Sequence, residues 1–225
     1  MIVGQGLLAK AFDRYTDSNE VLIFASGVSN SKEKDLTMFE REYTMLRTYS
    51  KTDLKLIYFS TVSVLDESLR ESLYTQHKLS IEKYITENFK NFIVFRLPNV
   101  VGHTPNNHTF FNSIKEKILL KQKIEVLTNA TRYLIDVDDL TELLPQVIEK
   151  ENRKIINVCF TNKAFVRELI SMIGTALGTD YIEELVEGGS NYEVDSSLFL
   201  SYTKPATVGL HQNYNYITVN KYIYR

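Results

Sequence analysis

Tyr74 and Lys78, four positions apart, are the side chains of this sequence best suited to acid–base chemistry. In a helix they lie one turn apart on the same face. A phenol with a pKa of about 10 is a weak base at neutral pH, but a neighbouring ammonium group lowers that pKa. Thr61 follows an apolar run, residues 56–59, so its hydroxyl should emerge at the sheet edge where α/β proteins bind ligands. We predict that Tyr74 exchanges a proton with a substrate oxygen that Thr61 holds.

Gly4 and Gly6 lie in the segment GQGLLA, residues 4–9, between an expected strand and an expected helix. In that context the first glycine permits a tight turn and the second lets the backbone approach a pyrophosphate. We expect Gly4, Gly6, Leu7 and Leu8 to contact a dinucleotide cofactor, NADP or NAD. The alternative is an ordinary turn between a strand and a helix.

Apolar runs alternate with helix-like segments, which predicts a parallel α/β sheet. The expected strands are 1–3, 21–25, 56–60 and 92–97, and the expected helices are 7–15, 36–49 and 74–88. Beyond residue 98 we expect helices at 109–120, 136–149 and 164–177 and strands at 124–127 and 155–158. The predicted fold is a Rossmann-like doubly wound parallel sheet in residues 1–100, with a small C-terminal α/β substrate lobe, residues 101–225, interleaved with it. A ligand cleft is expected where the two parts meet.

Only the polar residues 16–20 separate the first expected helix from the second expected strand. Dinucleotide-binding folds normally place a second strand there, ending about twenty residues after the glycine turn in the residue that reads the adenosine ribose. That unit does not fit, so we expect a sheet without the usual second and third strands. NAD is therefore not distinguished from NADP, and strand 1–3 becomes an edge that a second chain would cover. A homodimer is predicted.

The composition excludes several classes of protein. With 44% hydrophobic and 24% charged residues, the chain is expected to be globular. Its net charge of -2 argues against nucleic acid as a main partner. No run approaches the roughly 20 apolar residues of a membrane span, so a cytoplasmic protein is expected. Cys159 is expected to be a buried structural thiol, and the loop residues His103 and His108 do not predict a metal site.

Further segments occur in the order typical of one enzyme family. They are ASGVS at 25–29, STVSV at 60–64, RLPNVVG at 96–102 and TRYLIDVDD at 131–139. Together with Tyr74 and Lys78, they resemble the extended short-chain dehydrogenase/reductases, specifically the NAD-dependent epimerase/dehydratase group that acts on nucleotide sugars. The resemblance implies that Thr61, Tyr74 and Lys78 are the catalytic residues.

The same resemblance implies a cofactor site and a substrate site. It implies that Asn99 and Arg132 contact a nucleotide-diphosphate sugar, as Thr61 also does. The residues that it places along the cofactor are Ala25, Ser26, Gly27, Tyr74, Lys78 and Pro98.

Some positions depart from the family pattern. Val62 and Ser63 stand where the 4,6-dehydratases carry Asp and Glu, which argues against dehydration. Tyr133 replaces the usual Asp after Arg132.

Two patterns near the C-terminal half have structural interpretations. Asp138 or Asp139, next to Asp136, is expected to cap a helix rather than bind a metal. The partial alternation of Tyr214, Tyr216, Tyr222 and Tyr224 predicts a strand at an edge or a dimer contact, with base stacking as the alternative.

The sequence therefore predicts an NAD(P)H-dependent reductase of a 4-keto nucleotide-diphosphate sugar. The run at 25–30 and the Thr61 to Tyr74 spacing look most like reductases of bacterial capsule sugar synthesis, which places the enzyme in surface-polysaccharide biosynthesis. A nucleotide-sugar 4-epimerase with bound NAD uses the same residues and remains an alternative. A second alternative, from another class, is a non-catalytic binding or regulatory protein on the same fold.

Overall fold

Apolar strands from both halves of the chain form one parallel sheet. The computed structural model describes residues 1–203 and 211–223. Within these residues the main sheet has the order β1-β2-β3-β4-β9, and each neighbouring pair is parallel. Its strands are β1 (Ile2–Val3), β2 (Val21–Phe24), β3 (Lys55–Thr61), β4 (Phe92–Leu97) and β9 (Lys154–Asn157). The predicted α/β class is confirmed.

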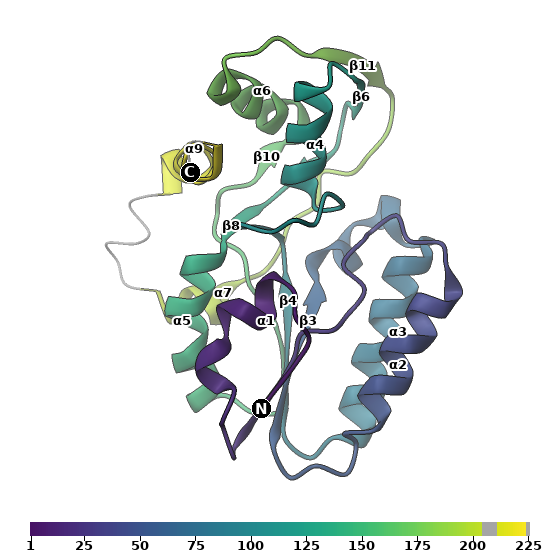
Figure 1. Cartoon of the computed structure of the whole chain (residues 1–225), viewed down its shortest axis with the longest axis vertical. Helices are drawn as coiled ribbons and strands as arrows, with labels where there is room; N and C mark the ends of the chain where they lie inside the picture. Colours follow the sequence, from purple (N-terminus) through teal and green to yellow (C-terminus); the bar gives the residue numbers. More distant parts are fainter. Residues whose placement is uncertain (204–210, 224–225) are drawn as a thin grey trace.

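Helices cover both faces of this sheet, with α2 and α3 on one side and α1 and α5 on the other (Figure 1). In β3, Leu56 and Tyr58 pack toward α2 and α3, whereas Ile57 and Phe59 belong to the core beneath α5. The central strands are thus buried on both sides, which explains their continuous apolar runs. The helices are α1 (Leu7–Ala11), α2 (Leu36–Arg47), α3 (Leu73–Asn88) and α5 (Val137–Lys150), with 3-10 turns η1 (Asp13–Tyr15), η2 (Val62–Leu65) and η3 (Glu67–Leu69).

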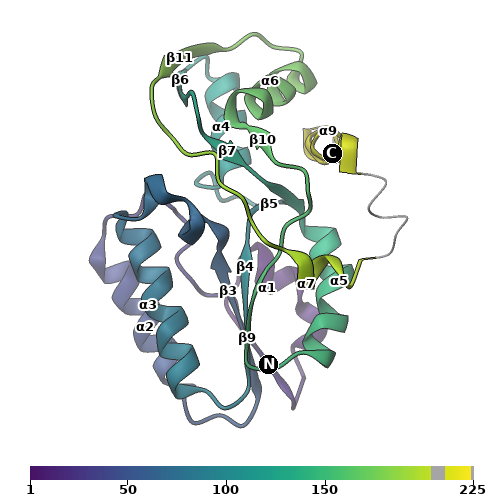
Figure 2. The same ribbon diagram turned by 180° about the vertical axis from the view of Figure 1, so that it is seen from behind.

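A second, smaller core lies beyond the carboxyl ends of the main strands (Figure 2). Its short strand pairs are β5 (Asn99–Val101) with β8 (Leu134–Asp136), β6 (Lys123–Leu127) with β11 (Ile182–Val186), and β7 (Thr131–Arg132) with β10 (Ala164–Phe165). Its helices are α4 (Phe110–Leu119), α6 (Val166–Leu177) and α9 (Tyr214–Ile223). The chain returns to the main sheet through α5 and β9, and α7 (Ser197–Leu200) contacts β9; the 3-10 turn η4 (His211–Asn213) precedes α9.

The main sheet ends at β1, which pairs only with β2 among the described residues. The helix predicted over 7–15 is shorter, because Phe12 leaves helical geometry at the end of α1. Phe12 is fully buried and its ring lies 5.4 Å from that of Phe59. The chain then passes through η1 directly into β2, without the strand–helix–strand unit that a full dinucleotide-binding sheet would insert.

The C-terminal tyrosines form helix α9, so the predicted strand is wrong. Tyr214 and Tyr222 are eight positions apart and lie on one helical face, and both reach the N-terminal end of α5. Tyr216 is 56% exposed, and Tyr224 lies outside the described residues. The hydroxyls of Tyr214 and Tyr222 both bind Asp136, and a helix can bring them to this one residue because their side chains lie on the same helical face.

Asp136 caps α5, two or three positions before the predicted caps Asp138 and Asp139. Its carboxylate accepts from the backbone N–H of Asp138 at 2.9 Å and from the Tyr222 hydroxyl at 2.6 Å. Asp138 and Asp139 occupy the first turn, where carboxylates interact favourably with the helix dipole. The Tyr214 hydroxyl donates to the Asp139 carboxylate. The acidic run is therefore structural, as the sequence indicated, but the capping residue is a different one.

A buried ion pair fastens α3 to the sheet. Arg96 in β4 donates to both carboxylate oxygens of Glu82, with an Nη2–Oε2 distance of 2.6 Å. The Ser60 hydroxyl in β3 donates to Glu82 Oε1 at 2.6 Å. Glu82 is 3% exposed. Because Tyr74 and Lys78 lie on the same helix, this pair helps to set their position over the sheet.

Removal of the arginine should therefore destabilise the fold. Arg96→Met leaves the buried Glu82 charge without its cation, and we expect the free energy of unfolding to fall by about 3 kcal/mol. Lys83→Met breaks an exposed pair with Glu87 on the same helix and should cost less than about 0.5 kcal/mol. Urea unfolding measures both, and equal losses would contradict the anchoring role of Arg96.

Candidate active site

One cleft lies between the carboxyl ends of the main strands and the smaller core. Its volume is about 650 Å³, and residues from the glycine turn, β3, α3 and β5 line it. Of the site residues predicted from the sequence, only Gly4 is absent from its lining. The topology thus brings together side chains from distant parts of the chain, as the switch points of α/β sheets do.

The glycine turn leaves room for a ligand in the cleft. Gly4 has a φ of +127°, and an added Cβ would lie 2.3 Å from the carbonyl oxygen of Ala25. This glycine therefore permits β1 and β2 to end in close contact. Gly6 is the N-cap of α1, and a Cβ added there would meet nothing within 4 Å. The open backbone at Gly6 fits the close approach of a dinucleotide pyrophosphate.

Thr61 and Tyr74 meet at the wall of this cleft. Thr61 ends β3, is 8% exposed and accepts a hydrogen bond from the backbone N–H of Ser63 at 3.1 Å. The Tyr74 phenol comes from the first turn of α3 and lines the same cleft, and its interaction with the Thr61 side chain lowers the Tyr74 pKa. The structure therefore places two hydroxyl groups side by side, at a position where both can face one substrate oxygen.

Lys78 is close to Tyr74 but is held by other groups. Its Nζ lies 5.8 Å from the centroid of the Tyr74 ring. The ammonium donates to Tyr58 Oη at 2.8 Å and to Glu42 Oε1 at 3.0 Å, and Lys78 is only 2% exposed. The prediction that Lys78 lowers the pKa of Tyr74 therefore did not include the counter-charge of Glu42.

The pKa of Tyr74 is raised, not lowered as expected from its lysine. Burial is the main cause, because it disfavours the charged phenolate. The Lys78 charge and the hydrogen bond with Thr61 lower the pKa, while the Glu42 charge raises it. The sum leaves Tyr74 protonated at neutral pH, a state suited to donating a proton.

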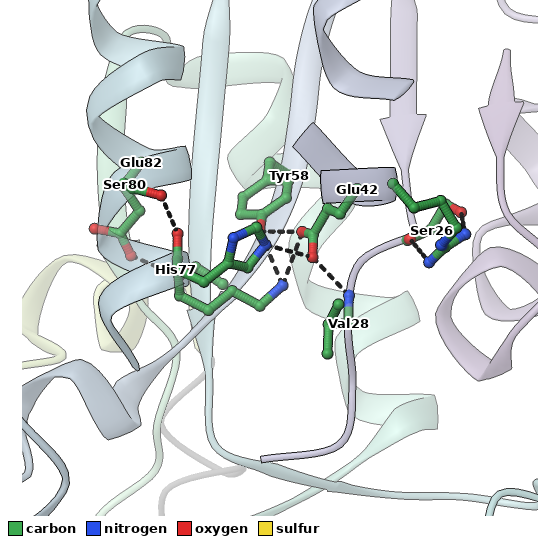
Figure 3. Close-up of polar contacts among 10 residues, drawn as sticks. Ser26, Val28, Glu42, Tyr58, His77, Ser80 and Glu82 are labelled. Atoms are coloured by element: carbon green, nitrogen blue, oxygen red, sulfur yellow. Dashed lines mark hydrogen bonds and ion pairs between the residues drawn. The ribbon is translucent and has the colours of Figure 1, made fainter. Parts of the chain in front are cut away.

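Glu42, Tyr58 and His77 complete the surroundings of the lysine and were missed in the sequence. Figure 3 shows Tyr58, His77 and Val28 converging on the Glu42 carboxylate. A signal for Glu42 existed, since it shares the buried face of α2 with Phe39 and Leu46, at helical spacing. A carboxylate on such a face needs a buried partner.

Arg132 and Asn99 also line the cleft. Arg132 Nη1 pairs with Asp66 Oδ2 at 3.1 Å and donates to the carbonyl of Thr131. Asn99 Nδ2 donates to the carbonyl of Tyr133 at 3.2 Å. The ion pair with Asp66 fixes the guanidinium of Arg132 and leaves further N–H groups available to a ligand.

Other reactive side chains do not form a second site. Cys159 is 1% exposed, and burial raises the pKa of its thiol. Among the described residues no group of His, Cys, Asp and Glu could hold a metal ion. His103 packs against the ring of Tyr222, and His108 lies at the edge of the cleft. No helix in the described part of the chain is long and apolar enough to cross a membrane.

The sequence of residues 2–159 matches the profile of the NAD dependent epimerase/dehydratase family. The chain belongs to this family. The match covers more than half of the chain and includes the segment with Thr61, Tyr74 and Lys78. Membership confirms the family resemblance, and with it an NAD-dependent class of enzyme. No curated protein sequence matches the chain.

Solved structures of low sequence identity share the fold. RMD from Pseudomonas aeruginosa, complexed with NADPH, has a TM-score of 0.69 at 13% identity, with 98% of each chain covered. UDP-glucose 4-epimerase from Thermus thermophilus, complexed with NAD, has a TM-score of 0.69 at 14% identity, covering 95% of this chain and 81% of the epimerase. UDP-glucuronic acid 4-epimerase from Bacillus cereus has a TM-score of 0.66 at 18% identity, covering 94% of this chain and 78% of that epimerase.

The burial of Cys159 predicts an unreactive thiol in this epimerase/dehydratase family member. A buried thiol with a raised pKa presents little thiolate, so labelling by a disulfide reagent at pH 8 should require unfolding. We expect complete labelling in urea and negligible labelling of the native protein over an hour, with Cys159→Ala as the unlabelled control. Rapid native labelling would instead indicate an accessible nucleophile.

Proposed function

We propose that this family member is a cytoplasmic NAD(P)H-dependent reductase of a 4-keto nucleotide-diphosphate sugar, acting in bacterial surface-polysaccharide biosynthesis. The observation that carries the proposal is that Thr61 and Tyr74 line one cleft together with Gly6, while burial raises the pKa of Tyr74 and so favours its protonated form. Carbonyl reduction needs a proton donor at the oxygen that gains charge. The fold shared with an NADPH complex and with nucleotide-sugar enzymes supports the choice of cofactor and substrate.

The residues of the cleft fit a dinucleotide. Gly6 would let the pyrophosphate approach the backbone, with Leu7 and Leu8 beside it, and Gly4 would shape this turn without lining the cleft. Ala25, Ser26 and Gly27 would lie along the cofactor, and Tyr74, Lys78 and Pro98 would meet its nicotinamide end. When bound, the reduced nicotinamide supplies a hydride. The adenosine end lacks the wall that the missing strands usually provide. Arg41, which donates to the Ser26 carbonyl at 2.9 Å, and Lys32 are basic side chains that line the cleft.

The proton chemistry belongs to this chain. As the hydride reaches the carbonyl carbon, the C=O π bond breaks and the oxygen takes the proton of the Tyr74 hydroxyl. Thr61 donates a hydrogen bond to the same oxygen and orients it. The Tyr74 phenolate that results is stabilised by Lys78 and recovers a proton from solvent. The substrate is thereby reduced by two electrons to an alcohol.

Arg132 and Asn99 would bind the rest of the substrate. A guanidinium presents several donors in a planar arrangement that matches a phosphate group. Asp66 holds Arg132 at the cleft wall, so less side-chain freedom is lost when a diphosphate binds. The amide of Asn99 offers both a donor and an acceptor to the sugar nucleotide.

A 4-epimerase is the second candidate, supported by the 4-epimerases that share the fold. Its first step removes a proton from a substrate hydroxyl and requires the Tyr74 phenolate, which a raised pKa disfavours. A non-catalytic binding protein is the third candidate, supported by the missing adenosine wall.

We also propose a homodimer, because β1 leaves an edge of the main sheet uncovered in the described chain.

Cofactor binding tests the proposal first. We expect micromolar binding of NADPH or NADH in a fluorescence titration, and oxidation of the nicotinamide when a UDP-4-keto sugar is added. Release of the oxidised cofactor after each turnover would favour the reductase over the epimerase. Absence of binding up to millimolar concentration, with or without nucleotide sugars, would overturn the enzyme assignment.

Removal of the phenol hydroxyl tests the role of Tyr74. Tyr74→Phe should lower kcat by about 10² to 10⁴-fold, because general acid catalysis contributes that much. The Kd for the nicotinamide cofactor should change little, since the ring remains in place. Tyr84→Phe, on the same helix but outside the cleft lining, is the matched control and should retain full activity. A Tyr74→Phe variant with unchanged kcat would exclude this residue as the proton donor.

Loss of the planar guanidinium tests the role of Arg132. Arg132→Lys keeps the charge next to Asp66 but loses the forked donor geometry, so KM for the nucleotide sugar should rise about tenfold. The kcat value should stay within about threefold of the wild type, because the proton chemistry is unaffected. Lys90→Met, an exposed residue paired with Asp53, controls for loss of a cation. An unchanged KM would remove Arg132 from the substrate site.

A further inference from the structure

Glu42 forms the most densely bonded buried charge beside the candidate site. It is fully buried on α2. Oε1 accepts from Tyr58 Oη and from Lys78 Nζ, the latter at 3.0 Å. Oε2 accepts from the backbone N–H of Val28 at 2.6 Å and lies 2.9 Å from His77 Nε2. One carboxylate therefore connects α2 to β3, to α3 and to the turn that follows β2.

The same contacts determine how many N–H groups of the Lys78 ammonium remain available to bind other groups. An ammonium has three N–H groups, and here Glu42 and Tyr58 occupy two of them. One N–H is available for the Tyr74 side of the cleft or for a bound ligand. The turn after β2 closes over this pair, because a Cβ added to Gly27 would lie 2.8 Å from both Glu42 Oε1 and Lys78 Nζ. The position of the ammonium is thus set before any ligand binds.

The charge of Glu42 also acts on Tyr74. A free lysine ammonium would favour the phenolate, as the sequence suggested. With the Glu42 carboxylate 3.0 Å from the ammonium, the effect of the Lys78 charge on the phenol is partly offset. The pKa of Tyr74 is raised by burial, and the Glu42 charge adds to that effect. Burial alone would raise the pKa of Glu42 itself, but the Lys78 charge and the hydrogen bonds from His77, Tyr58 and Val28 together lower it below its usual range.

We propose that Glu42 is a positioning residue that acts through Lys78, fixing the ammonium beside Tyr74 and offsetting its charge so that Tyr74 keeps its proton until a substrate carbonyl takes it. The use of this effect in catalysis rests on the proposed reductase function. The effect of Glu42 on Lys78 and Tyr74 does not depend on that function and can be measured in the protein alone. A reductase needs the protonated phenol at the start of each turnover. Burial of Tyr74 is the main cause of that bias, and the Glu42 charge adds to it.

Other charged groups around the phenol and its lysine are few among the described residues. Glu42 faces them from α2, Tyr58 from β3, and His77 and Lys78 from α3. Glu82 acts on Tyr58 but is paired with Arg96 and Ser60. Glu42 is therefore the carboxylate whose removal should change the charge felt by Tyr74.

The test is a direct titration of Tyr74 in the protein without cofactor. Ring-labelled tyrosine observed by NMR, assigned with Tyr74→Phe, should give a pKa above about 10 in the wild type. Glu42→Gln keeps the size of the side chain and removes the charge, and it should lower the pKa of Tyr74 by about one unit or more. Glu42→Asp, which retains the charge, should restore most of the wild-type value. Glu40→Gln, on the exposed side of the same helix, should change nothing.

The pH dependence of the reaction supplies a second measurement. Reduction requires protonated Tyr74, so its rate falls as pH rises through the pKa of that residue. A lower pKa in Glu42→Gln should move the loss of kcat to lower pH by the same interval. If Glu42 had a purely structural role, Glu42→Gln would lower thermal stability but would not change the pH at which kcat falls.

The outcomes separate this inference from the proposed function. A wild-type Tyr74 pKa below about 10, or a Glu42→Gln value equal to the wild type, would overturn the role of Glu42 even in an active reductase. If the Glu42→Gln chain does not fold, a wild-type Tyr74 pKa below about 10 would still overturn the inference. A protein that binds no nicotinamide but shows the expected Tyr74 shift would retain the Glu42 inference and lose the reductase.

Discussion

The buried ion pair between Glu42 and Lys78 is the interaction on which the rest of the site depends. Two opposite charges are removed from water at the junction of α2, α3 and β3, and each is acceptable there only because the other is present. Tyr58, His77 and the backbone of Val28 satisfy the remaining oxygen lone pairs. Because these partners come from separate elements, their arrangement also fixes the turn after β2 against the start of α3.

A second buried ion pair, between Arg96 and Glu82, holds α3 against the sheet. Arg96 and Glu82 join α3 to β4 and, through Ser60, to β3. This pair lies one turn beyond Lys78 on the same helix, so α3 is held at two points along its length. A helix held in this way presents Tyr74 to Thr61 at the end of β3 without support from a ligand. The relative position of Thr61 and Tyr74 is therefore set before a ligand binds, which is the condition for electrostatic stabilisation of a reacting oxygen by these proposed catalytic residues.

The short connection from α1 to β2 removes support at the other end of the cleft. A full dinucleotide-binding sheet extends past its first strand, and the added strands carry the residue that reads the adenosine ribose. Here β1 is the edge and η1 occupies the connection. The residues proposed to meet the nicotinamide, Tyr74, Lys78 and Pro98, are all present in the cleft lining, whereas the strands that usually wall the adenosine end are missing. The two ends of the proposed cofactor site are thus under different structural constraints.

The sequence by itself determined the α/β class, the strand boundaries of the main sheet within one or two residues, and the pairing of Thr61 with Tyr74 and Lys78. The spacing of apolar residues, the continuous apolar runs and the glycine turns are local signals, so they predict strands and helices directly from the sequence. Only the tertiary structure decided what surrounds Lys78, because Glu42, Tyr58 and His77 are brought to it by the packing of α2 on β3 and α3. It also decided that the C-terminal tyrosines form a helix, since their hydroxyls bind the distant start of α5. Charge pairing and burial depend on neighbours that are remote in sequence, and they set the protonation of Tyr74 more strongly than its own spacing from a lysine.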